Sequence, residues 1–148
     1  MNVYLDIDGV LLANDLNAAN YVHEFLEYVT QNHNVYWLTA HCKGDAQTAV
    51  RRLSLVFKPE TMKLIQDIKA TNWNTAKTEA IDFSRPFLWF DDDLFYEEKQ
   101  TLLKNNCLDS WIEVDLRQDP DYLSRFLVSF PIPISELVNT KEKHSETV

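Results

Sequence analysis

Cysteines and long apolar runs are both scarce in this sequence of 148 residues. The two cysteines, Cys42 and Cys107, lie far apart and without metal-ligand spacing, so we expect reduced thiols rather than a disulfide or a zinc site. No apolar window reaches the length of a membrane span, and acidic residues follow the first apolar residues before a signal-peptide hydrophobic region can form. We therefore expect a cytoplasmic protein without a membrane partner.

Basic residues are also in the minority, because 14 lysines and arginines stand against 23 aspartates and glutamates, a formal net charge of -9. This charge disfavours nonspecific binding to nucleic acids and anionic membranes. Between His41 and Arg85, however, basic residues outnumber acidic ones. A hydrophobic content of 45% is ample for one packed core, so we expect a single domain over 1–134 and a loosely ordered polar tail over 135–148.

Apolar strands and amphipathic helices alternate along the chain. The predicted strands are 2–5, 35–39, 87–90 and 111–114. The predicted helices are 16–31 with Asn14 or Asp15 as N-cap, 46–56, a short one within 58–72, one capped by Asn74 or Thr75 and ending at Ile81, 96–104, and 121–130 after Asp119 and Pro120. This order predicts an α/β fold, a three-layer Rossmann-like sandwich with a mainly parallel central sheet.

Acidic or hydroxyl side chains follow three of these strands. The stretch VYLDIDGV places Asp6 and Asp8 two residues apart after the first strand, where their carboxylates repel each other unless they are solvated or a cation lies between them. Thr39 ends the second strand, and Asp91 and Asp92 follow the third. Ligands of parallel sheets bind beyond the carboxyl ends of the strands, so we expect these groups to face one crevice.

This set of side chains suits phosphate-ester hydrolysis. Asp6 and Asp91, on adjacent strand ends, can hold Mg²⁺, which prefers carboxylate, water and phosphate oxygens. Asp6 can then attack phosphorus and form an aspartyl-phosphate, while Asp8 gives a proton to the leaving group and takes one from water. Thr39 can hydrogen-bond a phosphate oxygen, and Lys77, near a helix N-terminus, can stabilise developing negative charge.

In order along the chain, these motifs resemble the haloacid dehalogenase-like (HAD) phosphohydrolase superfamily. The motifs are DIDGV at 6–10, LT at 38–39, Lys77, and FLWFDDD at 87–93. The resemblance implies Asp6 and Asp8 as catalytic residues, Thr39, Ala40 and Lys77 as contacts of the substrate phosphate, and Asp6, Asp8, Asp91 and Asp92 as ligands of Mg²⁺. The third acidic residue, Asp93, leaves open which of Asp91, Asp92 and Asp93 contacts the metal directly.

The segments between the motifs are too short for a large cap domain, so the resemblance implies a small capless enzyme. An open crevice takes its specificity from surface contacts, with His41 as a candidate substrate contact, or from a neighbouring subunit of a homo-oligomer. The basic excess between His41 and Arg85 favours a phosphorylated polymer end, such as an oligonucleotide terminal phosphate, with a small phosphorylated metabolite as the rival.

The sequence therefore predicts a magnesium-dependent phosphomonoester hydrolase, with two alternatives. One is a nucleic-acid end-processing phosphatase, because NWNTAK and RPFLWFDDDL are similar to stretches in small capless HAD domains of end-repair proteins. The other is a noncatalytic phosphate-binding protein of the same fold. A receiver-type signalling module has its acidic pair after the first strand and a lone phosphoacceptor after the third. It fits poorly, because the order differs here and no predicted strand after Asp93 ends in a threonine or a lysine.

Overall fold

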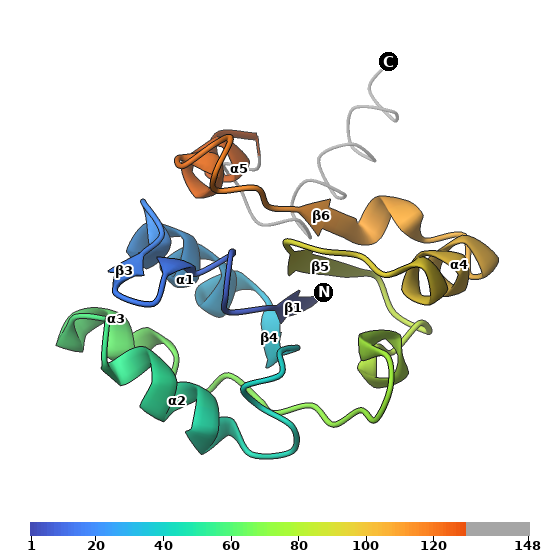
Figure 1. Cartoon of the computed structure of the whole chain (residues 1–148), viewed down its shortest axis with the longest axis horizontal. Helices are drawn as coiled ribbons and strands as arrows, with labels where there is room; N and C mark the ends of the chain where they lie inside the picture. The colour runs from blue at the N-terminus through green and yellow to red at the C-terminus, as the bar shows by residue number, and fades with distance from the viewer. Residues whose placement is uncertain (130–148) are drawn as a thin grey trace, which may run out of the picture.

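The computed structural model describes residues 1–129, and its centre is a parallel sheet (Figure 1). Within that range the sheet has the strand order β4-β1-β5-β6. Its strands are β1 (Asn2–Leu5), β4 (Asn34–Trp37), β5 (Phe87–Asp91) and β6 (Trp111–Glu113). All three neighbouring pairs are parallel, which confirms the predicted α/β class with a mainly parallel sheet. The predicted tail, 135–148, lies outside the described residues.

Apolar side chains cover both faces of this sheet, which explains why its strands read as nearly continuous apolar runs. In β1, Val3 and Leu5 belong to one core cluster and Tyr4 to a second one. The first cluster packs with α1 (Val22–Asn32), α2 (Ala46–Ser54), α3 (Pro59–Leu64) and α5 (Tyr122–Ser129). The second packs with α4 (Tyr96–Lys104) and the short 3₁₀ turns η1 (Lys77–Ala80) and η2 (Leu108–Ser110).

The predicted start of the first helix is wrong. The chain after β1 forms a small antiparallel hairpin from β2 (Leu12–Asn14) and β3 (Asn17–Ala18), and α1 begins only at Val22. The Oδ1 atom of Asn14 accepts hydrogen bonds from the Leu16 backbone N–H and the Asn17 side chain, both at 3.0 Å. Asn14 therefore organises a tight turn instead of capping a helix, a role for which asparagine is equally suited.

The helix predicted to end at Ile81 is also wrong, because only η1 forms there. Asn74 and Thr75 do not cap it. Their backbone N–H groups donate instead to the Glu79 carboxylate at 3.1 Å each, and the N–H of Ala76 does so at 2.8 Å. The Glu79 carboxylate therefore accepts the hydrogen bonds of the backbone N–H groups of this loop, and the loop that leads to Lys77 stays non-helical.

The other predicted elements are found with small shifts. The helix 96–104 matches α4, and the short helix expected within 58–72 is α3. The last helix begins at Tyr122 instead of residue 121, and its predicted end at Phe130 lies outside the described residues. Among residues 1–129, no helix combines the length and the apolar character that a membrane crossing requires.

Candidate functional site

The strand register places the predicted acidic residues side by side. Leu5 of β1 pairs with Phe90 of β5, so the residues that follow, Asp6 and Asp91, emerge together at the carboxyl edge of the sheet. The backbone N–H of Asp6 donates to the Phe90 carbonyl oxygen at 3.1 Å, which fixes this juncture. Thr39 follows β4 on the other side of β1 and is buried. The expected meeting of Asp6 and Asp91 at one edge is confirmed.

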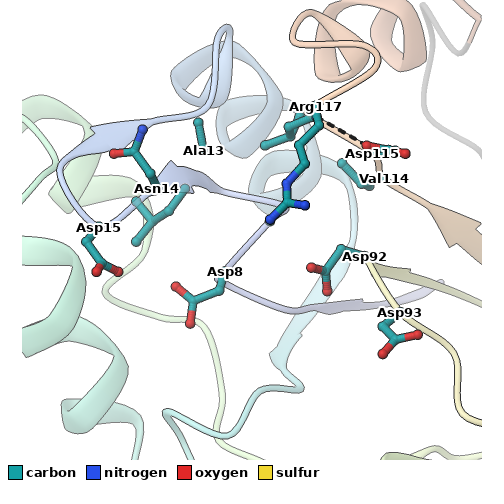
Figure 2. Close-up of a pocket in the computed structure, with 12 residues that line it drawn as sticks. Asp8, Ala13, Asn14, Asp15, Asp92, Asp93, Val114, Asp115 and Arg117 are labelled. Atoms are coloured by element: carbon teal, nitrogen blue, oxygen red, sulfur yellow. Dashed lines mark hydrogen bonds between the residues drawn. The ribbon is translucent and has the colours of Figure 1, made fainter.

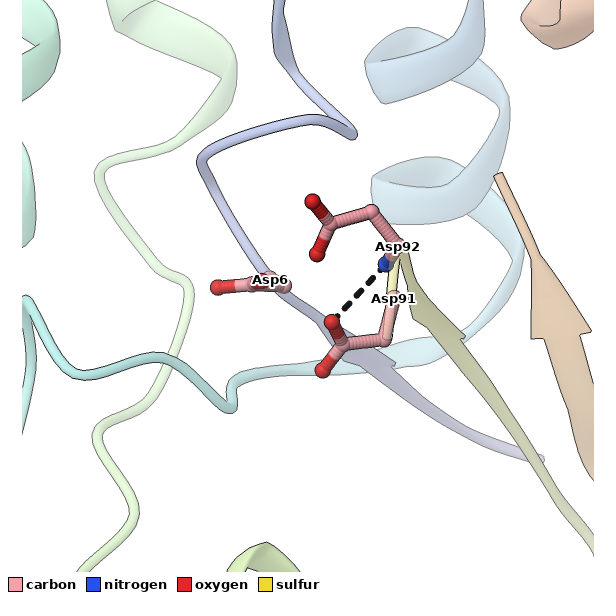
Figure 3. A group of neighbouring side chains, drawn as sticks. All are labelled: Asp6, Asp91 and Asp92. Atoms are coloured by element: carbon pink, nitrogen blue, oxygen red, sulfur yellow. Dashed lines mark hydrogen bonds between the residues drawn. The ribbon is translucent and has the colours of Figure 1, made fainter. Parts of the chain in front are cut away.

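Three carboxylates form a compact cluster at this edge (Figure 3). Asp6, Asp91 and Asp92 each offer one oxygen within 4.8 Å of the others. Asp6 and Asp91 are buried, at 8% and 2% exposure, whereas Asp92 is exposed. The Oδ1 atom of Asp91 accepts hydrogen bonds from the backbone N–H of Asp92 at 2.8 Å and of Asp93 at 3.3 Å. The cluster is therefore held by the backbone turn that follows β5.

Lys77 is the cation of this cluster. Its Nζ lies 2.6 Å from Asp91 Oδ2 and 3.4 Å from Asp6 Oδ2. Asp91 Oδ2 also accepts a hydrogen bond from the Trp89 indole N–H at 3.1 Å. Although burial lowers the pKa of Lys77, the neighbouring Asp6 and Asp91 carboxylates outweigh it and raise that pKa above its ordinary value. Lys77 therefore stays protonated where the sequence predicts a phosphate contact.

One ammonium does not balance the negative charge of the cluster. Burial and the nearby Asp6 carboxylate raise the pKa of Asp91 to about 8, even though Lys77 favours the ionised form. The buried carboxylates of Asp6 and Asp91, with oxygens within 4.8 Å of each other, repel when both are ionised. A bound cation commonly stabilises such a pair. The arrangement is thus chemically suited to an oxygen-preferring divalent ion.

A buried glutamate, Glu98 of α4, positions Lys77, and the sequence reasoning missed it. Its side chain is 2% exposed. It accepts hydrogen bonds from the Lys77 backbone N–H at 2.9 Å and from the Phe95 backbone N–H at 3.1 Å. Glu98 therefore links the start of α4 to the start of η1. In the sequence it is one acidic residue in a polar helix, and no local signal marks it as buried.

Asp8 lies apart from the carboxylate cluster, beside His41 and Arg52. Its Oδ2 is 2.6 Å from His41 Nε2, and its Oδ1 is 3.8 Å from a terminal nitrogen of Arg52. Arg52 also lies 3.2 Å from Asp15 Oδ1. His41, expected to contact substrate, thus contacts the expected acid/base residue. Arg52, which belongs to the basic segment between His41 and Arg85, joins the site as well.

The turn after β4 connects this second group to Thr39. The backbone N–H of His41 donates to Thr39 Oγ1 at 3.3 Å, so the hydroxyl oxygen already accepts one bond. Ala40 is exposed beside it. The structure thus brings Asp6, Asp91, Asp92 and Lys77 together, and it places Asp8, His41 and Arg52 as a neighbouring group.

At Gly9, the backbone that carries Asp8 passes close to the Asp92 side chain. Its φ is +79°, and a Cβ there would lie 2.8 Å from Asp92 Cγ and 2.9 Å from Asp92 Cβ. Only glycine fits this position without moving Asp92. The turn is closed by the Ile7 carbonyl oxygen, which accepts hydrogen bonds from the backbone N–H groups of Val10, Leu11 and Leu12 at 3.2, 2.9 and 3.1 Å.

A cavity of about 530 Å³ opens next to these groups (Figure 2). Asp8, Gly9, Asp92 and Asp93 form one side of it, and the β2 region and residues 114–117 after β6 form the rest. The segment after β6 was not part of the predicted site. Its contribution follows from the parallel pairing of β6 with β5, which places both strand ends at the same edge.

Comparisons with protein-family models, with curated proteins and with solved structures found no significant match to this chain. The functional assignment therefore depends on the geometry of the site.

Proposed function

We propose that the protein is a magnesium-dependent phosphomonoester hydrolase of the HAD type that acts through an aspartyl-phosphate on Asp6. The observation that carries this proposal is the cluster of Asp6, Asp91 and Asp92 oxygens within 4.8 Å of one another, with Lys77 beside two of them. The apolar clusters on both faces of the sheet support the finer fold, a three-layer Rossmann-like sandwich without a large cap.

The donor set suits Mg²⁺. Ligand oxygens about 2.1 Å from an octahedral ion are at most about 4.2 Å apart, close to the spread of these three carboxylates. All donors are carboxylate oxygens, and the exposed Asp92 leaves one side open to water and phosphate. Bound Mg²⁺ neutralises carboxylate and phosphate charge. Asp6, Asp91 and Asp92 would hold it.

Asp6 is the proposed nucleophile. Its Oδ1 accepts the Ile7 backbone N–H at 2.8 Å, which fixes the carboxylate plane, and its Oδ2 faces Lys77. In the first step, an Asp6 oxygen bonds to phosphorus while the ester P–O bond breaks. Lys77, with Thr39 and the chain at Ala40, stabilises the charge that develops on the phosphoryl oxygens.

Asp8 is the proposed acid and base. In its protonated form it gives a proton to the leaving oxygen in the first step. Water then attacks phosphorus, the bond from Asp6 to phosphorus breaks, inorganic phosphate leaves, and Asp8 takes the proton from the attacking water. The contacts with His41 and Arg52 fix the position of its carboxylate on the cavity wall.

The test is hydrolysis of p-nitrophenyl phosphate by Asp6→Asn. We expect a loss of at least about 10³-fold in kcat/KM with the melting temperature retained, since the amide keeps the shape and lacks the nucleophilic charge. A chelator should abolish wild-type turnover, and added Mg²⁺ should restore it.

The matched control is Asp109→Asn, which removes an exposed carboxylate away from the site. This variant should keep wild-type kinetics. Wild-type turnover by Asp6→Asn would refute the nucleophile. Phosphate binding by the wild type without turnover of any ester would instead support the noncatalytic alternative.

A further inference from the structure

The cavity beside Asp8 is where the leaving group of a phosphomonoester would lie. Asp8, the proposed proton donor, lies on its wall, and so does Asp92 of the carboxylate cluster. Asp6 and Lys77 are not on that wall. A phosphoryl group at Asp6 with its ester oxygen toward Asp8 therefore directs the rest of the molecule into the cavity.

Arg117 is aimed into this cavity from the segment after β6. Its guanidinium lies between the labelled side chains of Asp8, Asn14 and Asp92 in the close-up (Figure 2). Asp115 Oδ1 accepts the backbone N–H of Arg117 at 3.2 Å and that of Gln118 at 3.3 Å, a turn that directs the side chain inward. Over the described part of the chain, residues 1–129, Arg117 pairs with no carboxylate.

The charges on the cavity wall limit what Arg117 can bind. Among the described residues that line the cavity, Arg117 is the single cation. The lining also contains five aspartates: Asp8, Asp15, Asp92, Asp93 and Asp115. A guanidinium binds one carboxylate or phosphate group strongly through two parallel hydrogen bonds. A polyanion, however, would extend further charges toward the aspartates, within the roughly 10 Å over which such repulsion acts.

The basic segment between His41 and Arg85 offsets these aspartates only in part, at Asp8 and Asp15. Arg52 already faces Asp8 and Asp15. The Lys43 ammonium lies 4.0 Å from the centre of the Trp73 ring. These contacts weaken the argument for a phosphorylated polymer end and favour a small leaving group.

We propose that Arg117 determines specificity by binding a single anionic group at the far end of a small leaving group, such as the carboxylate of a phosphorylated hydroxy acid. This inference rests on the proposed phosphatase function and names its substrate class. The leaving group would carry its phosphorylated hydroxyl near Asp8 and its anionic group at Arg117.

Two matched esters test the proposal: 4-carboxyphenyl phosphate, and 4-carbamoylphenyl phosphate, which has nearly the same shape and lacks the charge. For Arg117→Gln, we expect kcat/KM for the carboxylate ester to fall about 10-fold to 100-fold, mainly through KM, because the contact exists before and during the reaction. For the carbamoyl ester, the change should stay within about 3-fold. Comparing variants on each ester cancels the difference in leaving-group acidity.

Arg51→Gln is the matched control, because it removes the same charge from an exposed position on α2 that does not line the cavity. It should leave both esters unaffected. Equal losses on both esters in Arg117→Gln would overturn the role of Arg117 and leave the phosphatase proposal standing. Absence of turnover of both esters by the wild type would overturn the proposed function and this inference together.

A terminally phosphorylated oligonucleotide provides the third arm. If the wild type hydrolyses it faster than 4-carboxyphenyl phosphate, and if raising the salt concentration sharply lowers that rate, a polyanion is the substrate and the inference is wrong.

Discussion

Replacing Gly9 with alanine should weaken magnesium binding, whereas the same replacement at Gly44 should not. The two glycines have nearly equal φ values, +79° and +82°, in the left-handed region. An alanine there costs about 1–2 kcal/mol of stability at either position. In the absence of metal, both variants should therefore lose thermal stability, and Gly9→Ala should lose at least as much as Gly44→Ala.

The two positions differ in what the added methyl group meets. At Gly9 it would lie 2.8 Å from Asp92 Cγ, while at Gly44 the nearest atom is Asn72 Cγ at 3.7 Å, an ordinary contact. Carbon atoms pack at about 3.5–4.0 Å, so Gly9→Ala must displace the Asp92 carboxylate by roughly 1 Å. Disturbing the support of a metal ligand typically costs 10-fold to 100-fold in affinity, and we expect a loss of about that size.

Isothermal titration with Mg²⁺ measures this affinity without requiring turnover, and the Mg²⁺ dependence of p-nitrophenyl phosphate hydrolysis provides a second reading. Gly44→Ala should match the wild type in both. If Gly9→Ala binds Mg²⁺ as tightly as Gly44→Ala does, then Asp92 is not a ligand or the turn adapts freely. Equal affinity would thus refute the proposal that Gly9 keeps Asp92 in place to bind Mg²⁺.

Two further predictions concern a lysine and a histidine. Lys77→Ala should lower kcat about 10²-fold or more, because the substitution removes a preorganised cation from the site. Lys69→Ala, at an exposed position, should not lower it. Equal losses would mean that Lys77 does not stabilise the phosphoryl charge. Burial and the N-terminal amine lower the pKa of His33 from 6.5 to about 4. As the pH falls, the unfolded chain therefore binds a proton at this ring before the folded protein does. The stability that the neutral ring contributes is complete above pH 6.5 and is lost as the pH falls through 4. Denaturant unfolding at pH 7 and pH 4.5 should show a smaller difference for His33→Gln than for the wild type or His23→Gln, and an unchanged difference would contradict the assignment.

The strands and their polar ends could be predicted from the sequence because the signal is local. β1 has the predicted bounds, and β5 extends the predicted run by one residue, to Asp91. Chain order and the parallel α/β pattern then place Asp6 and Asp91 at one edge, and the register confirms it. The roles of these residues in phosphate hydrolysis stay predictions.

The hairpin and the 3₁₀ turn could not be predicted, because each depends on one polar side chain with two equally local options. Asn14 can cap a helix or close a turn, and only the packing of the segment after it decides. Glu98 and Arg117 escape sequence reasoning for another reason. Glu98 lies 21 residues from Lys77, and Arg117 reaches the site only because β6 pairs with β5.

The distribution of cations makes the divalent ion a requirement of the proposed chemistry. Lys77 is engaged with Asp6 and Asp91, and Arg52 with Asp8 and Asp15. A phosphate monoester approaching Asp6 would thus meet carboxylates whose charge is only partly balanced. Without a further cation, nucleophile and substrate repel each other. A resident Mg²⁺, held by Asp6, Asp91 and Asp92, would remove this repulsion, and Arg117 would hold the other end of the proposed substrate.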